Sequence, residues 1–160
     1  MTDAMACAAD KAGLSLLVLN GPNLNLLGKR NPEIYGVLTL EQLEAELAEY
    51  AHTSYPSIGE LDFAQSNHEG TLIDVLHLAH LEFDGIVFNP AAYTHYSYAL
   101  RDAIEVIDVP VVEVHLSNVD VREDFRSVSV VREVCIAHFY GDGIQSYKDA
   151  IAYLAEGATE

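Results

Sequence analysis

The sequence predicts one α/β domain built around a parallel sheet. Five short apolar runs, rich in β-branched and aromatic residues, are typical of strands buried on both faces, and helical patterns lie between most of them. Alternation at this spacing favours parallel strands joined by crossover helices. The 160 residues carry no internal repeat, low-complexity tract or linker that would divide the domain.

The expected elements follow the chain in order. Strands are expected over the runs 14–20, 61–65, 85–89, 111–115 and 134–138. Thr39 is expected to cap the first helix, 40–51, and Gln42, three residues later, is expected to be its partner in a capping box. The remaining helices are expected over 71–82, 97–107 and 145–155, the second of these ending before Pro110.

The composition narrows the class of partner. Asp and Glu number 25 against 8 Lys and Arg, so the formal net charge is −17, while half of the residues are hydrophobic. That balance is typical of a folded acidic protein, and it lacks the basic footprint that nucleic acid or an anionic membrane surface requires. No apolar run reaches the roughly 18 to 20 residues that span a bilayer. We therefore expect no nucleic-acid or membrane partner.

The ends and the cysteines indicate the compartment. Residues 1–13 lack the features of a signal peptide and are expected to form a flexible extension, leaving 14–160 as the single domain. Cys7 and Cys135 form neither a disulfide framework nor a spaced set of metal ligands. A reducing compartment such as the cytoplasm fits this pattern.

Polar segments follow the expected strands at the points where they end. They are Asn20 to Asn25, Ser66 to Gly70, Asn89-Pro90 leading to Thr94-His95, and Glu113 to Asn118. In an open parallel sheet, ligands bind at the carboxyl ends of the strands. Any one of these segments could be an ordinary turn, but their convergence on one edge favours a site.

Glu113 and His115 lie two apart on an expected strand, so their side chains share a face. A carboxylate beside an imidazole fixes its tautomer and raises its basicity, as a general acid needs. Arg122 and Arg126 follow, four residues apart. The alternative is a surface pair at a strand end.

The long loop after the first strand carries Lys29, Arg30 and Tyr35 between Gly28 and Gly36, and a loop of this length is typical of a lid. Ionising a phenol at neutral pH requires a shift of about three units, or roughly 4 kcal/mol. A guanidinium about 4 Å away supplies roughly 4 kcal/mol at an effective dielectric of 20. Arg30 could therefore activate Tyr35, although a solvated turn is the alternative and is preferred for Lys29.

Four segments resemble the type II 3-dehydroquinate dehydratases (type II dehydroquinases). They are LNGPNLNLLGKRNPEIYG at 19–36, QSNHEGTLIDVLH at 65–77, FNPAAYTHYSYALRDAI at 88–104 and PVVEVHLSNVDVREDFR at 110–126. The resemblance implies a flavodoxin-like fold, with helices on both faces of a five-stranded parallel sheet. It also implies a homododecamer built from trimers, which converts 3-dehydroquinate to 3-dehydroshikimate and water without cofactor or metal.

The resemblance assigns the base side of the reaction to the lid and its surroundings. Tyr35 is similar to the family's tyrosinate base, which removes a C2 proton, and Arg30 resembles the lid arginine that supports it. Arg122 resembles a second arginine near this centre. Asn23 is implied to hold the water that stabilises the enolate oxygen.

The resemblance implies that His115 is the acid and that Glu113 orients it. His115 would protonate the departing C1 hydroxyl, because hydroxide is a poor leaving group. We expect the base and the acid to work on opposite faces of the ring.

One alternative is a flavin- or nucleotide-binding module on the same fold, for which GPNLNLLG is a poor phosphate loop. Another is a catalytically silent homologue. Biosynthetic and quinate-degrading roles share the same dehydration.

The resemblance also implies the substrate contacts. Asn89, together with Leu116 and Ser117, corresponds to the carboxylate-binding part of the family site. His95 and Arg126 resemble contacts to the ring hydroxyls. Asp102 would reach the site of a neighbouring subunit.

Overall fold

Five parallel strands form one sheet in the order β2-β1-β3-β4-β5, the strand order of flavodoxin-like folds. The computed structural model describes residues 13–29, 37–118 and 126–158. The strands are β1 (Leu14–Asn20), β2 (Ile58–Gln65), β3 (Gly85–Asn89), β4 (Val111–His115) and β5 (Ala137–Tyr140). The predicted fold class is confirmed.

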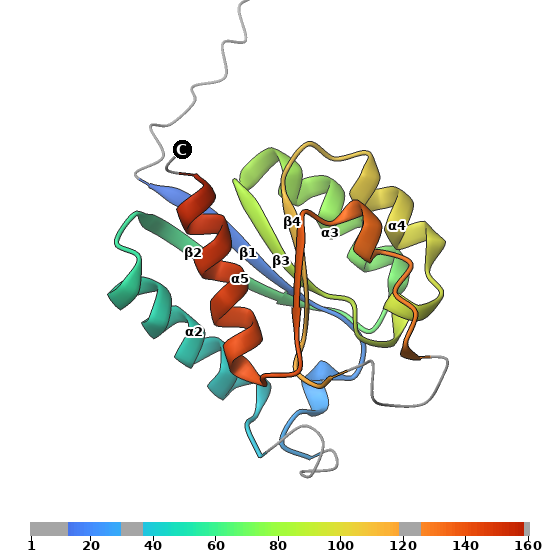
Figure 1. Cartoon of the computed structure of the whole chain (residues 1–160), viewed down its shortest axis with the longest axis horizontal. Helices are drawn as coiled ribbons and strands as arrows, with labels where there is room; N and C mark the ends of the chain where they lie inside the picture. Colours follow the sequence, from blue (N-terminus) through green and yellow to red (C-terminus); the bar gives the residue numbers. More distant parts are fainter. Residues whose placement is uncertain (1–12, 30–36, 119–125, 159–160) are drawn as a thin grey trace, which may run out of the picture.

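In the described residues, two helices cover each face of the sheet, so the domain has three layers (Figure 1). α2 (Leu40–Ser54) and α5 (Ile144–Gly157) lie on one face, and α3 (Glu69–Glu82) and α4 (Tyr98–Glu105) lie on the other. The described residues also form short 3₁₀ turns: η1 (Leu24–Leu26), η2 (Ala91–His95) and η5 (Arg132–Val134).

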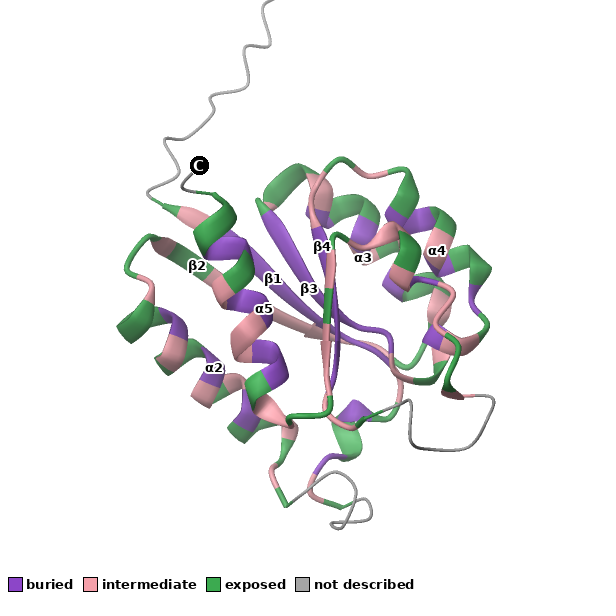
Figure 2. Ribbon diagram, in the orientation of Figure 1, coloured by how far each residue is buried: buried purple, intermediate pink, exposed green. Residues whose placement is uncertain are grey.

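The strand β4 shows how alternation sorts side chains between the two faces. Val112 and Val114 pack in the core beneath α2 and α5, whereas Val111 packs beneath α3 and α4. Because successive side chains point to opposite faces, Glu113 and His115 face the α3 and α4 layer. All five residues are buried, as are most residues of the central strands (Figure 2). Two polar side chains therefore lie on a face that is otherwise part of the core.

The start of α2 is the capping box that the sequence predicts. The Thr39 hydroxyl accepts the N–H of Gln42 at 3.2 Å, and Oε1 of Gln42 accepts the N–H of Thr39 at 3.0 Å. Two backbone donors that the helix leaves unpaired are satisfied in this way. The ends of the four helices in the described residues lie within three residues of their expected bounds, and the start of α2 and the end of α3 match them.

The predicted bounds of the last strand are wrong. Arg132–Val134 forms the turn η5, and β5 begins at Ala137 and runs to Tyr140. Val134 and Cys135 pack against the core beneath α3 and α4 instead of pairing in the sheet. An apolar run has the same composition in a buried turn and in a strand, so periodicity could not separate the two.

Part of the predicted organisation lies outside the described residues. Residues 1–12 of the expected extension fall there, as do Arg30, Tyr35 and Arg122 of the expected site. Gly13 is described with a positive φ of 99°, and the chain then enters β1. In the described ranges, no helix combines the length and the hydrophobicity needed to cross a membrane.

Candidate active site

The carboxyl ends of β1, β3 and β4 meet at one edge of the sheet, here called the carboxyl rim. Asn20 and Asn89, the last residues of β1 and β3, pair in register, and Phe88 pairs with Glu113, so the carboxyl ends of three neighbouring strands lie side by side. The chain passes from β1 to β2 on one side and reaches β3 on the other. Ligands of doubly wound sheets bind where the strand order reverses in this way.

A buried chain of hydrogen bonds ties β1, β3 and α5 together at the carboxyl rim. Nδ2 of Asn89 donates to the Tyr147 hydroxyl at 2.7 Å, and that hydroxyl donates to Oδ1 of Asn20 at 2.8 Å. Oδ1 of Asn89 accepts the N–H of Ala91 at 3.0 Å. Burial raises the pKa of Tyr147, so its hydroxyl stays protonated and can make this donation. Tyr147 accepts one of the two hydrogens of the Asn89 amide.

The turn after β1 is held against the turn after β3. The N–H of Gly21 donates to the carbonyl of Asn89 at 2.7 Å, and a Cβ on Gly21 would lie 2.8 Å from the carbonyl carbon of Pro90. Asn23 has a left-handed φ of 67°, and its N–H donates to Oδ1 of Asn67 at 2.9 Å. This conformation places the exposed Asn23 in the turn that leaves the carboxyl rim.

Glu113 is the centre of the described site. Its Oε1 lies 2.9 Å from Nε2 of His115 and accepts hydrogen bonds from the hydroxyls of Thr94 and Ser129. Glu113 is 1% exposed and His115 is 6% exposed. The structure therefore brings the predicted pair together, and the alternative of a surface pair at a strand end is wrong.

The surroundings of Glu113 keep it ionised. Burial opposes its charge, but the hydrogen bonds and charge of His115 and the hydroxyls of Thr94 and Ser129 hold its pKa below the ordinary value. An ionised carboxylate can only accept, so Nε2 of His115 carries the proton of the bond that they share. Nδ1 of His115 is the ring nitrogen that does not face Glu113.

His95 is a neutral neighbour of this pair. Its Nδ1 lies 2.7 Å from the carbonyl oxygen of Val128, which can only accept, so Nδ1 carries the proton and Nε2 is an acceptor in the neutral ring. Burial lowers the pKa of His95, and the charges of His115 and Arg126 lower it further. The predicted hydroxyl-binding residues His95 and Arg126 are thus close enough to interact.

The remaining predicted residues are distributed differently. Leu116 and Ser117 continue from β4 at the carboxyl rim, and the carbonyl of Leu116 accepts the N–H of Gly143 at 2.9 Å. Asp102 lies on α4, exposed, with its Oδ1 3.8 Å from the guanidinium of Arg101. That Asp102 acts in another subunit stays a prediction.

Sequence reasoning missed several residues of the site: Thr94, Ser129, Arg132 and Tyr147. The hydroxyls of Thr94 and Ser129 reach Glu113 from 19 and 16 residues away. Tyr147 lies 127 residues from its acceptor Asn20. In the sequence, Thr94 stands out only as the neighbour of His95, and the others have no local signal, because each acts through a contact that the fold creates.

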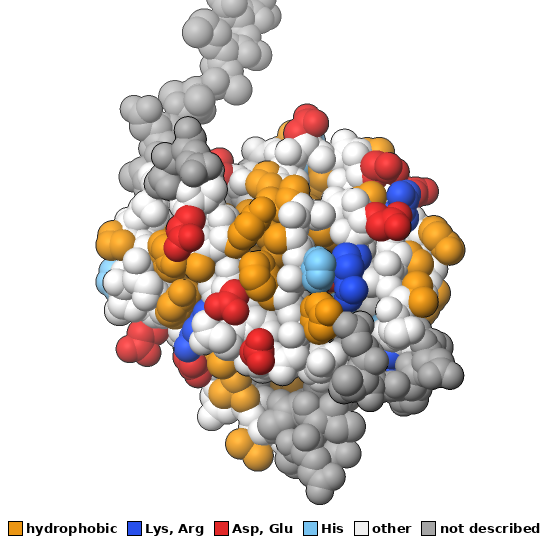
Figure 3. All heavy atoms as spheres, viewed as in Figure 1, with side chains coloured by type: hydrophobic (Ala, Val, Ile, Leu, Met, Phe, Trp, Pro, Cys, Tyr) orange, Lys and Arg blue, Asp and Glu red, His pale blue; other side chains and the backbone are white. Residues whose placement is uncertain are grey.

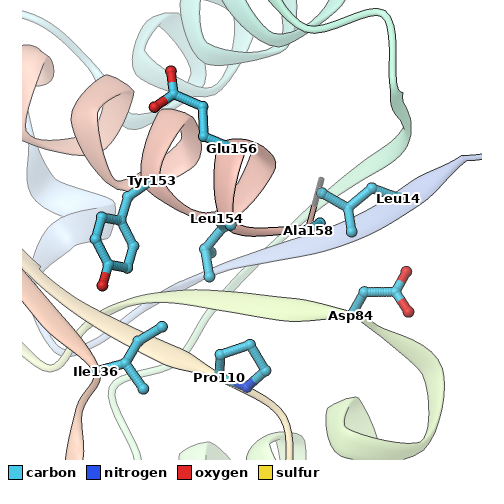
Figure 4. Close-up of a pocket in the computed structure, with 9 residues that line it drawn as sticks. Leu14, Asp84, Pro110, Ile136, Tyr153, Leu154, Glu156 and Ala158 are labelled. Atoms are coloured by element: carbon cyan, nitrogen blue, oxygen red, sulfur yellow. The ribbon is translucent and has the colours of Figure 1, made fainter. Parts of the chain in front are cut away.

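A cavity of about 680 Å³ lies at the opposite, amino-terminal edge of the sheet (Figure 4). Apolar side chains and two carboxylates line much of it: Leu14, Pro110, Ile136, Tyr153, Asp84 and Glu156. None of its lining residues within the described part of the chain is basic, and acidic side chains are also spread over the face in Figure 3. An anion would be repelled there. The groups suited to proton transfer lie at the carboxyl rim instead.

No group of three or more potential His, Cys, Asp or Glu metal ligands occurs within residues 13–29, 37–118 and 126–158. The carboxyl rim instead holds a buried carboxylate–imidazole pair, with an arginine and a second histidine near it. Together with the flavodoxin-like sheet, this defines an α/β enzyme equipped for acid–base chemistry.

The chain belongs to the class II dehydroquinase family, whose model, Dehydroquinase class II, matches residues 14–155. A 3-dehydroquinate dehydratase of Bacillus pumilus is 57% identical over 138 residues, which cover 86% of this chain and 92% of the relative. The type II dehydroquinase of Butyrivibrio crossotus has a similar crystal structure, with a TM-score of 0.85, 46% identity, and coverage of 89% and 97% of the two chains. That of Propionibacterium acnes also gives a TM-score of 0.85, at 38% identity, with coverage of 90% and 97%.

These comparisons confirm the predicted family and the predicted class of enzyme, a hydro-lyase. They give no support to a flavin- or nucleotide-binding module on this fold.

Proposed function

We propose that this chain eliminates water from 3-dehydroquinate to give 3-dehydroshikimate, through an enolate, with His115 as the acid and Tyr35 as the base. The observation that carries the proposal is the buried hydrogen bond between Glu113 and His115 at the carboxyl rim. It is supported by the relatives named as 3-dehydroquinate dehydratases.

The acid step follows from the tautomer of His115. When the ring is doubly protonated, Nε2–H donates to the ionised Glu113, and Nδ1–H remains for the departing C1 hydroxyl of the substrate. Transfer of that proton as the C1–O bond breaks releases water instead of hydroxide. Glu113 holds the ring in place and stabilises its charge throughout, without giving up a proton itself.

The base step belongs to residues outside the described part of the chain. In the proposal, Arg30 and Arg122 lower the pKa of Tyr35 so that its phenolate removes a C2 proton, and the electrons move onto the C3 oxygen. Asn23, exposed in the turn after β1, holds the water that stabilises the enolate oxygen. The support is their match to the family motif, together with the position of Asn23 at the carboxyl rim.

Substrate binding is assigned by chemistry. Nε2 of His95 accepts a ring hydroxyl, and Arg126 binds a second oxygen beside it. The amide hydrogen of Asn89 that Tyr147 does not take donates to the substrate carboxylate. The backbone of Leu116 and Ser117 completes this carboxylate site.

We propose further that residues 14–160 act as one catalytic domain in a dodecamer built from trimers, with Asp102 completing a neighbour's site. Tyr98 and Val106, at the two ends of the helix that carries Asp102, are exposed, as a contact surface would be before assembly. Light scattering on the purified protein tests the assembly. The proposal places the enzyme in the cytoplasm, where it serves either aromatic biosynthesis or quinate breakdown.

The decisive experiment follows the absorbance of the conjugated enone as purified protein acts on 3-dehydroquinate. We expect wild type to turn over, Tyr35→Phe to lose most activity, and His115→Ala to lose the elimination step. An inactive wild type would indicate a catalytically silent homologue. Normal turnover by Tyr35→Phe or His115→Ala would remove that residue from its proposed role.

A further inference from the structure

Arg132 stands beside the oxygen of Glu113 that does not face His115. Oε1 of Glu113 lies 2.9 Å from Nε2 of His115, whereas Oε2 lies 3.7 Å from Nε of Arg132. The backbone N–H of Arg132 donates to the Ser129 hydroxyl at 3.1 Å, and that hydroxyl also contacts both oxygens of Glu113. Arg132 is therefore tied to the carboxylate through its side chain and through its backbone.

Two stacked aromatic rings of β5 lie beside the guanidinium of Arg132. Tyr140 pairs in register with His115, and the guanidinium carbon of Arg132 lies 5.0 Å from the centre of the Tyr140 ring. The His138 ring stacks on Tyr140 at 5.7 Å with an angle of 12° between the planes. A cation over an aromatic face is attracted to it, so this stack limits where the guanidinium can move.

Stability alone does not account for this placement. Nε and one terminal nitrogen of Arg132 are buried and have no hydrogen-bond partner among the described residues. Burying guanidinium donors without partners opposes folding. The guanidinium nevertheless stays close to a carboxylate that is already hydrogen-bonded to two hydroxyls and an imidazole.

We propose that Arg132 is a positioning residue of the active site: its guanidinium holds Oε2 of Glu113, so that Oε1 stays directed at His115 and the carboxylate stays charged. The proposal rests on the dehydration proposed above. Arg132 acts through Glu113 and does not touch the substrate. A cation on the far side of the carboxylate keeps it from taking the proton that His115 must deliver.

The pH dependence of kcat is set in this proposal by the charge of Glu113 and by the titratable and charged groups that face it. These are His115 on its own strand, His95 from η2, Arg132 and Cys135 from the segment before β5, and His138 beside it in β5. From the 3.7 Å separation of Nε and Oε2, we expect that removing the positive charge of Arg132 raises the pKa of Glu113, because its ionised form loses an attraction. Since the reaction needs ionised Glu113, the acid limb of the kcat profile moves to higher pH.

The test compares Arg132→Gln, which removes the charge, with Arg132→Lys, which keeps it. We expect Arg132→Gln to lower kcat about tenfold with KM changed by less than about twofold, and Arg132→Lys to retain most of kcat. The matched control is Lys148→Gln, since Lys148 also pairs with a carboxylate, Glu46, and lies over an aromatic ring, Tyr50, away from the carboxyl rim. We expect it to leave kcat and the acid limb unchanged.

A double-mutant cycle shows whether Arg132 acts through Glu113. In a Glu113→Gln background, Arg132→Gln should cause no further loss of kcat, and losses that multiply would overturn the proposal. The proposal would also be overturned if Arg132→Lys and Arg132→Gln lost kcat equally. It would be overturned too if the acid limb of the kcat profile did not move in Arg132→Gln, even if the melting temperature fell. An inactive wild type would contradict the proposed function instead, so the two failures are distinguishable.

Discussion

Nε2 of His115 and Oε1 of Glu113 lie 2.9 Å apart on alternate residues of β4, with both side chains almost fully buried. The strand places them on one face, and the buried surroundings make their interaction strong. Because Oε1 of Glu113 accepts the Nε2–H of His115, the proton that His115 would deliver in the proposed reaction lies on Nδ1. The orientation of the proposed acid therefore depends on the charge of its neighbour.

Glu113→Gln tests this dependence. The amide keeps the shape of the side chain but cannot stabilise a charged imidazole, so we expect kcat to fall by about tenfold or more. Steady-state kinetics on 3-dehydroquinate measure the effect, with the exposed Glu60→Gln as control. Unchanged kcat in Glu113→Gln would show that the pair is structural.

The same carboxylate should make stability depend on pH. Its folded pKa is lower than 4.5, so its contribution to the free energy of unfolding is fully present above that value and is lost as pH falls through the folded pKa. Urea unfolding at about pH 5 and pH 3 should show a larger loss for wild type than for Glu113→Gln. Equal losses in the two proteins would contradict the lowered pKa.

Tyr147→Phe should destabilise the protein through the network at the carboxyl rim. Removing the hydroxyl leaves Nδ2 of Asn89 and Oδ1 of Asn20 without this partner in a buried site, which costs about 1 to 3 kcal/mol. Urea unfolding measures the loss. Tyr153→Phe, on the exposed side of the same helix, should change stability by less than about 0.5 kcal/mol. Similar values for the two variants would argue against the network.

Gly21→Ala should disturb the turn after β1. Its Cβ would meet the backbone of Pro90 at 2.8 Å, a contact that side-chain rotation cannot relieve. We expect lower stability and a lower kcat, because the turn that carries Asn23 must move. Gly70→Ala is the control: it lies in α3 with open space around it, and should stabilise by about 0.4 to 1 kcal/mol. Melting curves and kinetics that match wild type in Gly21→Ala would contradict this account.

Most of the fold could be predicted because its signals are local. The apolar runs of β1, β3 and β4 were placed at their observed bounds, since a buried parallel strand needs continuous hydrophobicity. The capping box at Thr39 was predicted because both partners lie within four residues. β5 was misplaced because Val134 and Cys135, although outside the sheet, are partly buried against the core, and such packing selects the same apolar residues as a strand.

The candidate site was predicted where spacing along one strand was enough. Glu113 and His115 share a face by alternation alone, and the positions of Asn23, Asn89 and His95 follow from the family motif. Thr94, Ser129 and Tyr147 could not be assigned in this way, since each meets its partner across at least 16 residues of chain.

The sequence by itself determined the class of fold, the edge of the sheet that carries the candidate site and the chemical types gathered there, because strand alternation and turn composition are local properties. Only the tertiary structure decided which nitrogen of His115 faces Glu113, that Glu113 is held ionised despite its burial, and that Arg132 stands on its far side over Tyr140. Those properties depend on hydrogen bonds and charges between separate elements, and such contacts exist only after the chain has folded.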